Sequence, residues 1–129
     1  MSVLSSSFKT AVTVIAALLS FSVMESAIAH AHLKVEVPAH DTVVATAPAA
    51  LRLEFSEALE LGFSGVALSD AKGNRIATGA ASLAPDSNMT LLVPLGTHLA
   101  AGVYTVVWHV LSRDGHKTKG SYSFTVQPG

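Results

Sequence analysis

The sequence predicts an antiparallel β-sandwich of about seven short strands. Three observations support this fold class. Apolar and polar residues alternate with a period of two in several short runs, and Gly, Pro, Asp and Asn separate these runs. No stretch of useful length after residue 31 shows the 3.6-residue period of an amphipathic helix. Several short strands spaced by turn residues are typical of a two-sheet sandwich.

The expected strands can be placed along the chain from this alternation. In residues 33–37, Leu and Val alternate with Lys and Glu, and Pro38 ends the run. The turn signal in residues 70–74 separates a third strand from a short edge strand. We expect strands at residues 33–37, about 50–56, 63–68, 75–78, 90–93, 104–110 and 122–126.

The first 31 residues have the features of a cleavable export signal. Lys9 precedes a mostly apolar run, residues 11–24, which is too short to span a membrane as a helix. Both Ala27-Ile28-Ala29 and Ala29-His30-Ala31 fit the rule for a cleavage site. We expect cleavage after Ala31, which leaves one domain, residues 32–129. Cleavage after Ala29 is the alternative.

The composition restricts the kinds of function. The chain of 129 residues has a formal net charge of −1 and no cysteine. Disulfides and thiolate metal sites are therefore excluded, and a metal would need nitrogen and oxygen ligands. The charge balance does not favour nucleic acid or an anionic membrane surface as a partner.

A polar stretch, residues 112–120, lies between the last two expected strands. It contains Asp114 and His116, which in an extended segment project to the same side, while Gly115 relieves crowding between them. The pair can therefore converge on one ion. Taken alone, Asp-Gly is also a common hairpin turn, and a loop histidine is often just solvated.

The spacing of Trp108, Ser112, Asp114, His116 and Gly120 resembles a motif of the periplasmic copper-binding CopC/YobA family. Further matching segments are residues 29–33, 38–39, 53–57, 63–65 and 99–104. The resemblance implies a Greek-key β-sandwich in the periplasm that binds one Cu(II) ion per chain. It also implies a separate inner-membrane copper transporter of the CopD type as partner, and a role in copper storage, buffering or delivery rather than catalysis.

The resemblance implies that the first residue of the mature chain is a histidine that binds the metal with Asp114 and His116. We expect this residue to be His32, because His32-Leu33-Lys34 resembles the mature start of the family. Cleavage would free its α-amine, which can chelate one metal together with the ring Nδ1. Cu(II) prefers such nitrogen and oxygen donors in a tetragonal arrangement.

Two further residues are expected near the metal. Glu57 aligns with a family glutamate, and we expect it to orient the terminal amine or a ligand ring. Trp108 is expected to pack beneath the site and limit the access of water, which is compatible with a role as an ordinary core aromatic. The alternative for Glu57 is an exposed carboxylate at a strand end.

Three alternatives remain open from the sequence. Cleavage after Ala29 would create a terminus, His30-Ala31-His32, that can wrap Cu(II) without Asp114 or His116. A copper oxidase of the histidine-brace kind also uses an N-terminal histidine, and a metal-free structural sandwich needs no ligands.

Met89 is the only methionine after residue 31, so we expect no second, thioether-rich Cu(I) site. We expect a monomer.

Overall fold

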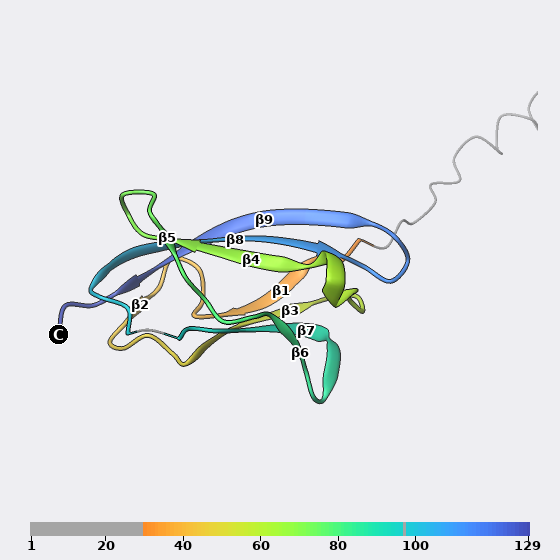
Figure 1. Cartoon of the computed structure of the whole chain (residues 1–129), viewed down its shortest axis with the longest axis horizontal. Coiled ribbons are helices and arrows are strands. Elements are labelled where there is room, and N and C mark those ends of the chain that lie inside the picture. The colour runs from red at the N-terminus through yellow and green to blue at the C-terminus, as the bar shows by residue number, and fades with distance from the viewer. Residues whose placement is uncertain (1–29, 97) are drawn as a thin grey trace, which may run out of the picture.

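Two β-sheets packed face to face make up the described part of the protein (Figure 1). The computed structural model describes residues 30–96 and 98–129. The expected signal segment, except for its last two residues, lies outside these ranges. Within them, no helix has the length and hydropathy needed to cross a bilayer.

One sheet has four strands and the other has five. The order in the first sheet is β1 (Leu33–Val37), β3 (Ala50–Phe55), β7 (Ser87–Pro94) and β6 (Ser82–Ala84). The order in the second sheet is β2 (Val43–Val44), β9 (Lys117–Val126), β8 (Gly102–Leu111), β4 (Gly65–Ser69) and β5 (Arg75–Ile76). The predicted β-sandwich is confirmed.

All seven expected strands are present with adjusted ends, and two strands were not expected. β2 and β6 contain two and three residues, which is too short for a recognisable alternation. β2 runs parallel to β9 and departs from the otherwise antiparallel pairing of the described strands. A 3₁₀ helix, η2 (Leu61–Phe63), replaces the start of the strand expected at residues 63–68.

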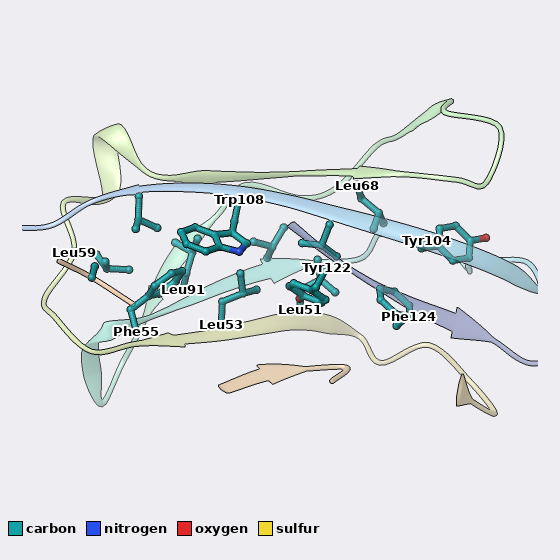
Figure 2. Packing of buried hydrophobic residues seen from close by; sticks show 14 of the residues in the cluster. Leu51, Leu53, Phe55, Leu59, Leu68, Leu91, Tyr104, Trp108, Tyr122 and Phe124 are labelled. Carbon is teal, nitrogen blue, oxygen red and sulfur yellow. The ribbon is translucent and has the colours of Figure 1, made fainter. Parts of the chain in front are cut away.

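Alternate side chains from both sheets fill the space between them (Figure 2). Along β3, Leu51, Leu53 and Phe55 are buried, while the residues between them are partly exposed, as the alternation predicts. Burying a leucine side chain completely contributes about 1.5–3 kcal/mol, so this face of β3 is a main source of stability. The rings of Phe55 and Trp108 meet edge to face across the sandwich, with centroids 5.1 Å apart.

The longest pairing joins β8 and β9 and ends in the polar turn. The pairing runs from Gly102 opposite Val126 to Leu111 opposite Lys117, so the turn is only residues 112–116. The second strand therefore begins five residues earlier than the sequence predicted. Its first residues lack an apolar alternation, because Thr118 contacts the N-terminal segment and Gly120 leaves room for Trp108.

Candidate metal centre

The turn between β8 and β9 brings Asp114 and His116 together. The Ser112 amide donates to the His116 carbonyl (2.9 Å) and closes the turn, and Gly115 adopts a positive φ of 92°. His116 Nδ1 lies 3.1 Å from Asp114 Oδ1, which is close enough for an ion pair. The two atoms are not aligned for a hydrogen bond, so His116 Nδ1 is buried without a hydrogen-bond partner. The predicted proximity of the two side chains is confirmed.

Ser112 is buried and holds the carboxylate in place. Its hydroxyl donates a hydrogen bond to Asp114 Oδ1, and the His116 amide lies 3.4 Å from the same oxygen. The Ser112 hydroxyl, followed by the His116 ring, keeps the pKa of Asp114 below its ordinary value. The carboxylate is therefore in its charged, ligand-competent form at neutral pH.

The segment just before β1 lies across this hairpin. The Thr118 hydroxyl donates to the Ala31 carbonyl (2.9 Å), and Ala31 is completely buried. Figure 1 shows β1 starting beside the end of the β8–β9 hairpin that carries the turn. The N-terminal segment and the Asp114–His116 turn, which the family resemblance implied to be neighbours, lie side by side.

Ser56, directly after β3, fixes the same segment from the other side. Its amide donates to the His32 carbonyl (2.9 Å), and its hydroxyl accepts from the His32 amide (2.9 Å). The hydroxyl also donates to the His30 carbonyl (3.1 Å). The main chain of residues 30–32 is therefore held between β3 and β9.

The ring that lies against His116 is that of His30. Their centroids are 5.0 Å apart, and the rings are nearly perpendicular. The ring of His32, which the sequence favoured as the first ligand, is 6.4 Å from that of His30, and His32 is exposed. Of the two histidines in this segment, His30 is therefore the one in contact with His116.

Two imidazole nitrogens at this place have no hydrogen-bond partner. His30 Nδ1 and His116 Nδ1 are both buried from solvent, and neither makes a hydrogen bond. An unpaired buried polar atom costs free energy unless a ligand or ion uses it. The donor set fits a transition metal that prefers nitrogen and oxygen. Among residues 30–96 and 98–129, no three His, Cys, Asp or Glu side chains are already arranged as a complete metal site.

Trp108 and Glu57, the two further residues expected near the metal, lie in different surroundings. Trp108 is buried beneath β9, with its ring so close to Gly120 that a Cβ there would lie 2.6 Å from Trp108 Cζ2. Glu57 follows Ser56 and is partly buried, and its carboxylate forms no hydrogen bond or ion pair with the described residues. The orienting role expected of Glu57 stays a prediction.

Sequence reasoning gave no role to Ser56, Thr118 or Ser112. Ser56 and Ser112 occur within the matched motifs, so the resemblance contained a signal for both. Thr118 gave none, because a threonine after a turn is common. Its role depends on a contact between residues 87 positions apart.

Comparison with known proteins agrees with this fold. A model of the CopC domain family matches residues 33–127. The chain belongs to the CopC domain family. The protein YobA of Escherichia coli strain K12 is 48% identical over 99 residues, which is 77% of this chain and 80% of YobA.

Two further relatives have names that refer to copper. The crystal structure of PcoC, a methionine-rich copper resistance protein from Escherichia coli, matches with a TM-score of 0.69 and 35% identity. The match covers 77% of this chain and 100% of PcoC. The copper transport protein CutJ of Bacillus subtilis is 28% identical over 102 residues, which is 79% of this chain but 19% of CutJ. The CopC-type region is thus a small part of that longer transport protein.

Proposed function

We propose that this protein binds one Cu(II) ion in the periplasm and stores, buffers or delivers it. The observation that carries the proposal is that His116 contacts both His30 and Asp114, with two buried imidazole nitrogens that make no hydrogen bond, in a member of the CopC domain family. Copper resistance and copper transport proteins among the relatives support copper as the metal. Nitrogen and oxygen donors without thiolates support the cupric state.

We propose His30 rather than His32 as the first residue of the mature chain. Cleavage after Ala31 would remove a completely buried residue and the carbonyl that Thr118 bonds. Cleavage after Ala29 keeps both and frees the amine of His30, whose ring already lies against His116. The cleavage alternative that the sequence left open is therefore preferred, and His32 becomes a neighbour of the site.

In this arrangement the α-amine and Nδ1 of His30 chelate the copper ion, and Asp114 and His116 supply an oxygen and a nitrogen. Ser56 and Thr118 orient the terminal segment, and Ser112 holds the Asp114 carboxylate. A terminal X-X-His wrap would need the His32 amide nitrogen as a ligand. That amide donates to Ser56 Oγ, so the wrap would cost this hydrogen bond. The contacts therefore favour the turn ligands.

A histidine-brace oxidase would use the same terminal histidine and a second histidine. The Asp114 carboxylate beside His116 argues for a closed binding site instead, because it supplies a further charged ligand at the metal. We therefore propose a binding protein rather than an enzyme. Copper-dependent peroxide consumption well above that of free copper would favour the oxidase.

The proposed partner is an inner-membrane copper transporter of the CopD type. CutJ supports this link, because a CopC-type region makes up 19% of a protein named for copper transport. In the present chain, Met89 is the only methionine after residue 31, in contrast to the methionine-rich PcoC. We therefore propose delivery of Cu(II) without a second site for Cu(I).

Electron paramagnetic resonance of Cu(II) added to the exported protein tests the site. Asp114→Ala and His116→Ala should each change the copper spectrum and weaken binding, whereas His98→Ala, at an exposed histidine before β8, should not. Unchanged spectra and affinities in both ligand variants would reject the proposal. A metal-free structural sandwich would show no thermal stabilisation by copper.

A further inference from the structure

A cleft of about 540 Å³ lies on the outer face of the five-stranded sheet, on the opposite side of β8 from the core. Its walls are η2 on one side and the start of β9 on the other, with His109 of β8 at its base. His109 pairs with Gly65 and Lys119 in the sheet, and its ring lies over Gly65, where a Cβ would be 3.0 Å from His109 Cε1. The glycine therefore lets the ring lie flat and leaves the cleft open.

Phe63 forms the apolar wall of this cleft and is 68% exposed. It lies on a well-anchored segment, because the Glu60 amide donates to the Leu111 carbonyl (2.8 Å) and the Leu111 amide donates to Ser64 Oγ (3.1 Å). Val107, which precedes His109 on the same face of β8, is 49% exposed. A large exposed aromatic ring on an anchored segment is a feature of binding surfaces.

The opposite wall is positively charged. Lys117 and Lys119 are two residues apart on β9, so both side chains project to this outer face, and both are exposed. Neither lysine forms an ion pair with a described residue, and no carboxylate lines the cleft. The chain as a whole has a net charge of −1, so the two lysines are a local exception to the overall charge.

We propose that this cleft docks a segment of another protein in which carboxylates flank an apolar side chain. The apolar side chain packs on Phe63, and the carboxylates lie against Lys117 and Lys119. This surface shares β9 with the copper site but lies on its other face, because Thr118, between the two lysines, points to Ala31. The proposal does not require copper, so it can fail or hold independently of the proposed function.

An anionic membrane is a less suitable occupant. Each lysine near an anionic membrane contributes about 1 kcal/mol, so two lysines give weak attraction in a chain whose net charge is negative. A peptide segment in the cleft can contact both Phe63 and the two lysines.

The test is a nuclear magnetic resonance titration of the copper-free exported protein with two synthetic hexapeptides. One is acetyl-Asp-Glu-Leu-Phe-Glu-Asp-amide, and the other has Asn and Gln in place of Asp and Glu. We expect shifts at Phe63, His109, Lys117 and Lys119, and an affinity for the acidic peptide about fivefold or more above that for the neutral one. Lys117→Glu combined with Lys119→Glu should abolish this preference, and Lys72→Glu, in the distant turn after β4, should preserve it.

Phe63→Ser should weaken binding of the acidic peptide. It should leave the copper spectrum unchanged, because Phe63 is not part of the metal centre. Equal binding of both peptides, an unaltered preference in the double lysine variant, or shifts elsewhere on the surface would overturn the proposal. Binding to phosphatidylglycerol vesicles without binding to the acidic peptide would also overturn it and identify a membrane surface instead.

Discussion

Thr118 and Ala31 are 87 positions apart, and a hydrogen bond of 2.9 Å from the Thr118 hydroxyl to the Ala31 carbonyl joins them. This bond ties the segment before β1 to the strand that follows Asp114 and His116. It is one of the few side-chain contacts that position the N-terminal segment beside the turn. The geometry of the proposed copper site depends on it.

Thr118→Val should loosen this segment without changing the shape of the side chain. Loss of the hydrogen bond leaves the buried Ala31 carbonyl unpaired and should lower the free energy of unfolding by about 1–3 kcal/mol. Copper affinity should fall as well. Thr125→Val, on the same strand, should change neither, because the Thr125 hydroxyl makes no hydrogen bond with the described residues. Equal copper affinity in the two variants would contradict a role of Thr118 in positioning the copper site.

Ser56→Ala should release the terminal segment from its other side. The substitution removes the hydroxyl contacts with His30 and His32, and we expect the His32 amide to exchange its hydrogen faster by about tenfold or more. Hydrogen exchange followed by nuclear magnetic resonance measures this rate. Ser121→Ala, at an exposed serine on β9, is the control. An unchanged exchange rate at His32 would show that Ser56 does not hold the segment.

The strands and the proximity of Asp114 and His116 could be predicted because their signals are local. The alternation in β3 requires only the burial of one face, and Asp-Gly with a histidine two residues from the aspartate is visible in the chain itself. The position of the N-terminal segment could not be predicted from residues alone, because it depends on the register between β1 and β3 and on Thr118. The choice between His30 and His32 depends on the same tertiary contacts, so the expectation of His32 stays a prediction beside our proposal of His30. Both follow a cleavage pattern, and the burial of Ala31, which supports His30, is a tertiary property.

Gly120→Ala should destabilise the protein through Trp108. A Cβ at residue 120 would lie 2.6 Å from the indole ring, so the ring or the backbone of β9 must move. We expect a loss of about 1–3 kcal/mol in the free energy of unfolding, together with a shift in the fluorescence of Trp108, the only tryptophan. Gly96→Ala, where a Cβ would meet nothing within 4 Å, should have little effect on either quantity. Wild-type stability in Gly120→Ala would mean that the ring moves freely.

His40 should make the stability depend on pH near neutrality. Its hydrogen bond and charge interaction with Glu36 raise the pKa of His40 above its ordinary value of 6.5. A raised pKa in the folded state means that the stabilisation is complete below about pH 6.5 and is lost as the pH rises through the folded-state value. His40→Gln should remove this decline in melting temperature, whereas His98→Gln should keep it. A His40 titration midpoint at or below 6.5 would contradict this prediction.

The most direct test of the copper site compares Cu(II) affinity among three forms of the copper-free protein. One begins at His30, the second has one additional residue before His30, and the third begins at His32. We expect the first form to bind most tightly, and the other two to bind about tenfold or more weakly, because each loses the pairing of a free amine with the ring beside His116. Equal affinity of the extended form and the form that begins at His30 would contradict a site built on the terminal amine.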